Sequence, residues 1–161
     1  MTAKCWYWKE GIPKEVCQLI LKEGAQDRFS PGETRDEAGD QYRNNHIFFL
    51  EKHHWFEGVL LNFARIANVS AGWKFDWNDC EKVQISRYES GQRYEWHADE
   101  NIFRDSDAIR KLTVVCQIND PADYVGGGLF LEGFDENMLI KQGDVIVFPS
   151  LVRHTAKKIE S

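Results

Sequence analysis

The stretch RYEWHAD, residues 93–99, places a histidine and an aspartate two positions apart. In an extended strand, His97 and Asp99 project from the same face, whereas Trp96 lies on the opposite face. An imidazole nitrogen beside a carboxylate oxygen supplies two of the three protein ligands of a 2-His-1-carboxylate site, which leaves positions open on Fe(II). The spacing alone is weak evidence, because H-x-D occurs often by chance. A second histidine is therefore needed.

The chain offers few histidines to complete such a site. They are His46, His53, His54, His97 and His154. His53 and His54 open a predicted surface helix, where a solvated side chain is the simpler interpretation, and His46 lies in an apolar run. His154 lies in LVRHTAKKI (151–159), a later predicted strand, and a sandwich can bring two such strands together. We therefore expect His154 to be the third ligand.

Hydrophobic periodicity divides the chain into two parts. The N-terminal part reads as two amphipathic helices, over 12–24 and 53–69, with short strands at 5–11 and 46–50. The C-terminal part reads as short antiparallel strands at 83–89, 93–99, 111–119, 128–133, 137–141, 144–149 and 151–159. Turn-rich segments predict loops at 29–41 and 100–111, the second beside the ligand strand and able to cover the site.

These patterns predict one α+β domain over residues 1–161, in which a helical support (1–82) packs on an antiparallel β core (83–161). The net charge of -6 argues against nucleic-acid binding through bulk electrostatics. The four cysteines form no CxxC pair, which argues against a disulfide framework or a thiolate zinc site. The sequence has no signal-peptide core and no membrane-length apolar run. We expect a cytoplasmic protein without a membrane partner, and composition leaves its oligomeric state open.

Several motifs, in order, resemble one enzyme family. RYESGQRYEWHADE (87–100) closely resembles the Y-x-x-G-Q-x-Y-x-x-H-x-D stretch of the prolyl 4-hydroxylase-like Fe(II)/2-oxoglutarate dioxygenases. RKLTVVCQINDPADYVGGGLFL (110–131) and KQGDVIVFPSLVRH (141–154) resemble the segments that follow in that family. The first of these two segments resembles bacterial PKHD-type hydroxylases more than the animal collagen enzymes. The resemblance implies a double-stranded β-helix (jelly-roll) core of antiparallel strands with the N-terminal helices packed on it.

Carried over to matching positions, the resemblance implies roles for individual residues. His97, Asp99 and His154 would bind Fe(II), Tyr94 would line the catalytic site beside the metal, and Tyr88 would contact 2-oxoglutarate, with Gln117 flanking this cosubstrate. The implied reaction uses O2, with ascorbate as an optional reductant. It hydroxylates a prolyl or other amino-acid residue, in a peptide, a protein or a small amino acid, and it releases succinate and CO2.

The C-terminus departs from the family pattern. In relatives, a lysine or arginine further along than Ser161 pairs with the far carboxylate of 2-oxoglutarate, and the last core strand follows there. We therefore expect the last core strand to be missing. Lys158 shares strand parity with His154, so we expect it to bind that carboxylate as a point charge.

Two alternatives to an active hydroxylase follow from the same residues. A non-catalytic or truncated metal-binding jelly-roll module is compatible with the missing terminal segment. A zinc hydrolase shares the ligand types but is disfavoured, because no glutamate stands in an HExxH-type helix to act as a base. Of the remaining features, Gly126–Gly128 reads as a turn, Trp96 is the best of the tryptophans for a substrate platform, and four arginines read as surface residues: Arg87, Arg93, Arg104 and Arg110.

Overall fold

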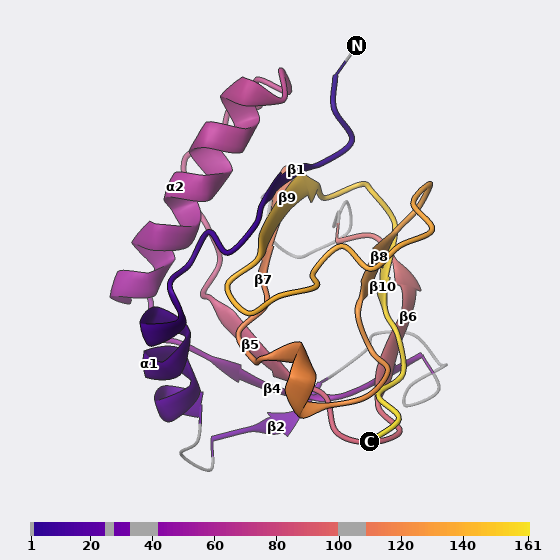
Figure 1. The fold of residues 1–161 in the computed structure, drawn as a ribbon. Helices are drawn as coiled ribbons and strands as arrows, with labels where there is room; N and C mark the ends of the chain where they lie inside the picture. The colour runs from indigo at the N-terminus through magenta and orange to yellow at the C-terminus, as the bar shows by residue number, and fades with distance from the viewer. Residues whose placement is uncertain (1, 25–27, 33–41, 100–108) are drawn as a thin grey trace.

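The computed structural model describes residues 2–24, 28–32, 42–99 and 109–161. These residues form three antiparallel sheets, and two helices cover one side of them (Figure 1). In chain order the elements are β1 (Trp6–Trp8), α1 (Lys14–Gly24), β2 (Ser30–Pro31), β3 (Arg43–Asn44), β4 (His46–Phe49), α2 (Trp55–Ser70), β5 (Gln84–Arg87), β6 (Arg93–His97), β7 (Leu112–Cys116), the 3-10 helix η2 (Pro121–Asp123), β8 (Leu129–Leu131), β9 (Val145–Pro149) and β10 (His154–Ala156).

The helices pack through the apolar faces that their periodicity predicts. Cys17 and Ile20 of α1 and Phe56 of α2 are buried, and α2 contacts β7 and β9. His54 begins α2: its Nδ1 accepts the Phe56 backbone N–H at 3.2 Å. The prediction of a solvated histidine is therefore wrong for His54, because this side chain satisfies an N–H group at the helix start. Within the described residues, neither helix is both long and apolar enough to cross a membrane.

Strand β9 is the centre of the sheet β1-β9-β7, and all five of its residues are buried. It reads as a continuous apolar run because both of its faces are covered. Val145 joins a core cluster with Ile12 of the N-terminal part and Phe48 of β4. Ile146 and Phe148 join a second cluster on the opposite face. The N-terminal helices and the C-terminal strands therefore share one core.

The sheet β3-β6-β10-β8 positions the two strands that carry the predicted ligands. In its register, His154 of β10 lies opposite His97 of β6, with an irregularity before the Ala156–Tyr94 pair. Beyond β10 the chain keeps pairing on both sides: Lys157 N–H donates to the Gly128 carbonyl and Ile159 N–H to the Gln92 carbonyl. β10 is thus held from both sides, which fixes the position of His154.

One predicted strand is absent. Residues 137–141 form no strand. The Met138 N–H donates to the Leu129 carbonyl of β8 at 2.7 Å, but side chains accept the N–H groups of the three residues that follow. Asn137 Oδ1 accepts the N–H groups of Leu129 and Leu139, and Asp144 Oδ2 accepts those of Ile140 and Lys141. Conversely, the sequence did not predict β2 or β3. Residues 33–41 and 100–108 of the two predicted loops lie outside the described residues.

Candidate metal centre

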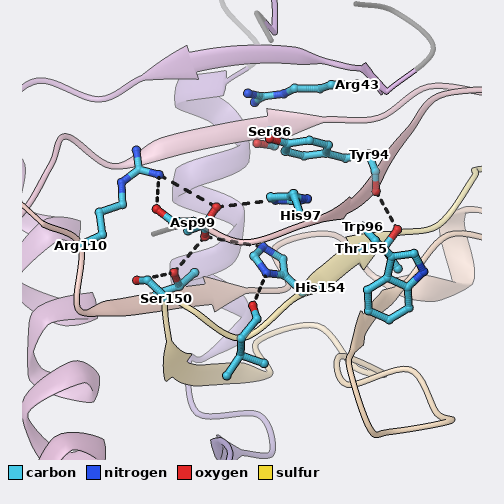
Figure 2. Close-up of polar contacts among 12 residues, drawn as sticks. Arg43, Ser86, Tyr94, Trp96, His97, Asp99, Arg110, Ser150, His154 and Thr155 are labelled. Carbon is cyan, nitrogen blue, oxygen red and sulfur yellow. Dashed lines mark hydrogen bonds and ion pairs between the residues drawn. The ribbon is translucent and has the colours of Figure 1, made fainter. Parts of the chain in front are cut away.

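His97, Asp99 and His154 point at one another from two paired strands (Figure 2). His97 ends β6, Asp99 follows two residues later, and His154 begins β10. The distance from His97 Nε2 to Asp99 Oδ1 is 3.6 Å, and that from His154 Nε2 to Asp99 Oδ2 is also 3.6 Å. One ligand atom from each residue lies within 4.8 Å of the others. Strand parity and register thus assemble a group that can hold a metal ion.

The backbone sets the tautomer of both imidazoles. His97 Nδ1 lies 2.8 Å from the Glu95 carbonyl oxygen, and His154 Nδ1 lies 3.1 Å from that of Val152. A carbonyl can only accept, so each Nδ1 carries the proton and donates it. Each Nε2 therefore presents a lone pair toward Asp99, as a metal-binding histidine requires.

A hydroxyl chain orients the Asp99 carboxylate. Thr113 Oγ1, on β7, donates to Asp99 Oδ2 at 2.9 Å, and Ser150 Oγ lies 3.0 Å from Thr113 Oγ1. Because the Thr113 proton is used on Asp99, Ser150 donates to Thr113. The Asp99 backbone N–H also donates to the Ser150 carbonyl at 2.9 Å. Sequence reasoning missed both hydroxyls, since nothing local in the chain links residue 113 or 150 to residue 99.

Arg110, predicted as a surface residue, is 31% exposed and also contacts Asp99. Its Nη1 donates to the Asp99 carbonyl at 3.4 Å and lies 4.0 Å from Asp99 Oδ1, while its Nη2 donates to Glu81 Oε1 at 2.9 Å. The guanidinium partly offsets the charge of the Asp99 carboxylate and ties the ligand loop to the rest of the domain.

The ligand cluster is mostly buried, and its side chains are the donor types that bind a metal cation. The side chains of His97, His154 and Asp99 are only 9%, 7% and 21% exposed. Burial, and then the neighbouring His154, lower the pKa of His97 to about 4, so its imidazole is neutral near pH 7. Two imidazole nitrogens and one carboxylate form a donor set that fits Fe(II) and leaves other coordination positions open.

Tyr94 lies against the cluster. Its ring stacks on His97 with ring centroids 3.5 Å apart and planes 12° apart. On its other face the Arg43 guanidinium carbon lies 4.7 Å from the ring centroid, so the three side chains form a stack (Figure 2). Burial raises the pKa of Tyr94, which keeps the phenol neutral. The stack restricts the orientation of the His97 ring.

The three residues predicted to contact the cosubstrate lie in different surroundings. Tyr88 is largely buried, and that burial raises its pKa to about 12. Gln117 Nε2 donates to Tyr124 Oη and to the Asn119 carbonyl, both at 3.0 Å. Lys158 is exposed and lines a groove of about 350 Å³ with Trp96, whose side chain is directed away from His97 (Figure 2). The negative charge of Asp99 also contributes to the raised pKa of Tyr88.

Comparison with known proteins agrees with this geometry. The family model of the 2OG-Fe(II) oxygenase superfamily matches residues 83–161. A PKHD-type hydroxylase from Prochlorococcus marinus is 32% identical over 81 residues, which are 49% of this chain and 36% of the relative. The chain thus spans about a third of the length of the curated relatives it matches.

Solved structures share the fold at low identity. A prolyl-4-hydroxylase from Pseudomonas putida has a TM-score of 0.74 and 17% identity, and the match covers 98% of this chain and 87% of that one. A prolyl hydroxylase from Trichoplax adhaerens, in complex with a peptide fragment of the hypoxia inducible factor oxygen degradation domain, has a TM-score of 0.74 and 18% identity. That match covers 98% of this chain and 79% of the neighbour. The antiparallel sheets and two helices of this chain therefore adopt the fold of these proteins.

Proposed function

We propose that the chain is a member of the 2OG-Fe(II) oxygenase superfamily, whose model matches residues 83–161, and that it is an Fe(II)- and 2-oxoglutarate-dependent hydroxylase of the prolyl 4-hydroxylase-like type. The observation that carries the proposal is the convergence of His97 Nε2, His154 Nε2 and the Asp99 carboxylate within 4.8 Å. These three groups would hold Fe(II). When bound, Fe(II), 2-oxoglutarate and O2 supply the oxidising chemistry that hydroxylates a C–H bond and releases succinate and CO2.

The residues of this chain would prepare the site for that chemistry. The Glu95 and Val152 carbonyls hold the two imidazoles in the metal-binding tautomer, and Thr113 fixes the carboxylate. Tyr94 covers one face of His97 and keeps water from it. Tyr88 would donate its hydroxyl hydrogen to the cosubstrate, which its raised pKa permits near neutral pH. Gln117 would flank the cosubstrate, as predicted from the resemblance.

The proposed substrate is a prolyl or other amino-acid residue in a peptide or protein. Support comes from the Trichoplax adhaerens neighbour, which is described in complex with a peptide fragment. We further propose that residues 1–161 act as one domain, since Ile12, Phe48 and Val145 share a core cluster. The alternative raised in the sequence analysis is a non-catalytic metal-binding module. One reaction product distinguishes the enzyme from such a module.

That product is succinate. We would incubate the chain with Fe(II), ascorbate, 2-oxoglutarate and O2 and measure succinate by NMR, first without a prime substrate and then with proline-containing peptides. The enzyme forms succinate at a rate that requires Fe(II), and Asp99→Ala abolishes it. His53→Gln is the matched control, because the His53 side chain is 83% exposed and lies outside the cluster. Fe(II) binding without any succinate would favour the non-catalytic module.

A further inference from the structure

A lysine and a cysteine lie side by side where the chain runs on from the β4–β5 pairing, outside the candidate metal centre. The Leu50 N–H donates to the Val83 carbonyl at 2.9 Å, which continues the pairing past the ends of both strands. Beyond it, Lys52 Nζ lies 3.4 Å from Cys80 Sγ and also donates to the Cys80 carbonyl. A side-chain nitrogen and a thiol sulfur, 28 residues apart in the chain, are thus in direct contact.

Acidic side chains hold Lys52 in this position. Lys52 Nζ donates to Asp79 Oδ1 at 2.9 Å and lies 3.9 Å from Glu57 Oε2. The Glu57 side chain is only 9% exposed, and it accepts the His53 N–H at 3.2 Å, so the start of α2 fixes it. Lys52 is 30% exposed and Cys80 is half-buried. A small oxidant dissolved in the solvent can therefore reach the pair.

The other cysteines of the chain have different surroundings. Cys17 and Cys116 interact with each other in the core cluster beneath α1, and Cys5 packs against the second core cluster. Cys80 instead has the Lys52 nitrogen against its sulfur. An oxidised Cys80 thus meets an amine where other oxidised cysteines commonly meet a second thiol.

Cysteine chemistry provides a route to a bond between these two atoms. A thiol is oxidised to a sulfenic acid, whose sulfur can be attacked by a thiol or by a nitrogen. Hydrogen peroxide would transfer one oxygen atom to Cys80 Sγ, so that an S–O bond forms, the O–O bond breaks and water is released. The Glu57 carboxylate, which interacts with the thiol, can take its proton in this step.

The second step joins the two side chains. The Lys52 amine, after its ammonium has lost a proton, attacks the sulfenic sulfur of Cys80. An S–N bond forms, the S–O bond breaks, and a second water is released. One peroxide molecule thereby oxidises the pair by two electrons, and the products are the S–N bond, two water molecules and one proton from the ammonium.

We propose that hydrogen peroxide links Lys52 Nζ and Cys80 Sγ through a reversible sulfenamide bond. The bond would close the loop between these residues, which contains the whole of α2. It would also fix a segment that supports the candidate metal centre, since the next residue, Glu81, accepts from Arg110, and Arg110 contacts Asp99. The inference concerns a site apart from the metal ligands and does not rest on the proposed function.

The surroundings of the pair make the reaction depend on pH. Burial raises the pKa of Cys80, aided by Glu57, and outweighs Lys52, which lowers it. The hydrogen bond to Asp79 raises the pKa of Lys52, and His53 also faces Asp79 and Glu57. The thiolate is the form that attacks peroxide, and the free amine is the form that attacks sulfur. The rate of bond formation should therefore rise at least about tenfold between about pH 7 and pH 9.

Peptide mapping tests the proposal. The full chain is treated with hydrogen peroxide, with a chelator present to exclude iron-catalysed oxidation, and is then digested with trypsin for mass spectrometry. The expected product joins residues 44–65, uncut after Lys52, to residues 75–82, and is about 2 Da lighter than the two peptides together. Dithiothreitol should separate them. In the undigested chain the closed loop should raise Tm by about 5 °C, and reduction should reverse this rise.

Variants of the two partners and one matched control accompany the wild type. Lys52→Arg keeps the charge beside Asp79 but replaces the amine with a guanidinium, which is a weaker nucleophile, so both the joined peptides and the rise in Tm should be lost. Cys80→Ser should lose them as well. Lys82→Arg is the control: Lys82 is two residues from Cys80, but its Nζ lies 3.5 Å from Glu51 Oε2. This variant should form the bond as the wild type does, and thermal melting before oxidation confirms that each variant is folded.

Two results would overturn the proposal. The first is a wild-type Cys80 that accumulates as sulfinic acid, about 32 Da heavier, to the same extent as in Lys52→Arg, because Lys52 then does not capture the sulfenic acid. The second is a bond from Cys80 to Lys82 or to another cysteine in place of Lys52. Either result leaves the proposed function untouched, since iron takes no part in the experiment.

Discussion

His97 and His154 are direct register partners across the β6–β10 pairing, with ring centroids 4.2 Å apart. The candidate metal centre thus depends on the register of two central strands. A shift of one residue would turn either imidazole to the opposite face of the sheet. Pairing of β10 with both β6 and β8 guards against such a shift.

Removing one imidazole tests the ligand assignment. His154→Gln should lower Fe(II) affinity by at least about 100-fold, because two protein ligands cannot hold the ion in a three-ligand site. Anaerobic calorimetry with Fe(II) measures the change. The exposed His53 gives the control, and His53→Gln should bind Fe(II) as the wild type does. Equal affinity in the His154 and His53 variants would remove His154 from the site.

The hydroxyl that holds Asp99 should matter less than a ligand but measurably. Thr113→Val keeps the shape of the side chain and removes the donor to Asp99 Oδ2. We expect Fe(II) affinity to fall about 10- to 100-fold, the usual range for residues that orient metal ligands. Thr113→Ser retains the hydroxyl and should restore most of the affinity. If valine and serine bind Fe(II) equally well, the hydroxyl plays no part in orientation.

Tyr88 separates cosubstrate binding from metal binding. Tyr88→Phe removes one hydroxyl and should weaken 2-oxoglutarate binding about tenfold, the effect of one good hydrogen bond to a charged group. Fe(II) affinity should stay constant, since Tyr88 is not in the ligand cluster. Titration of Fe(II)-loaded variant with 2-oxoglutarate measures the effect. Unchanged cosubstrate affinity would contradict the role given to Tyr88.

Asp144 should make the stability of the fold depend on pH. It is fully buried, and its carboxylate accepts from Tyr7 Oη at 2.6 Å and from the N–H groups of Glu10, Ile140 and Lys141. Burial raises its pKa, but the four hydrogen bonds outweigh burial and lower the pKa below the ordinary 3.8. A carboxyl group whose pKa is lower in the folded than in the unfolded chain stabilises the fold at pH values above its unfolded pKa. That stabilisation is lost as the pH falls through the pKa of the folded state.

Asp144→Asn should therefore destabilise the fold near pH 7 by about 1.5–3 kcal/mol, since the amide brings a donor among donors. Urea unfolding at several pH values measures this difference. The difference in unfolding free energy between wild type and variant should shrink below about pH 4, because Asp144 of the wild type then becomes protonated, first in the unfolded and then in the folded chain. A difference that stayed constant down to pH 2 would show that the carboxylate charge is not what stabilises this region. Fe(II) affinity of the folded variant should match the wild type.

Local patterns in the sequence predicted the antiparallel strands, the two helices and the meeting of His97, Asp99 and His154. His97 and Asp99 share strand parity, and the helices and most strands follow their apolar periodicity. Residues 137–141 were predicted wrongly because an apolar run does not reveal that the side chains of Asn137 and Asp144 accept most of its N–H groups. His54 was placed wrongly because a capping histidine has no distinct local pattern.

The residues around the ligands were the least predictable. Thr113, Ser150 and Arg110 reach Asp99 only through strand pairing between distant segments. Arg43 lies between the predicted loop at 29–41 and the predicted strand at 46–50, and the two residues of β3 are too few for an alternating pattern to be detected. Strand parity favoured Lys158 as a cosubstrate ligand, but this residue lies beyond the end of β10 at Ala156 and is exposed.

The central claim is that this cluster holds Fe(II) with positions left open for a 2-oxo acid. The most direct test is anaerobic addition of 2-oxoglutarate to the Fe(II)-loaded chain while its visible absorption spectrum is recorded. The account predicts a new metal-to-ligand charge-transfer band that saturates with 2-oxoglutarate and is absent in Asp99→Ala. Stoichiometric Fe(II) binding with no such band, or an identical band in Asp99→Ala, would contradict it.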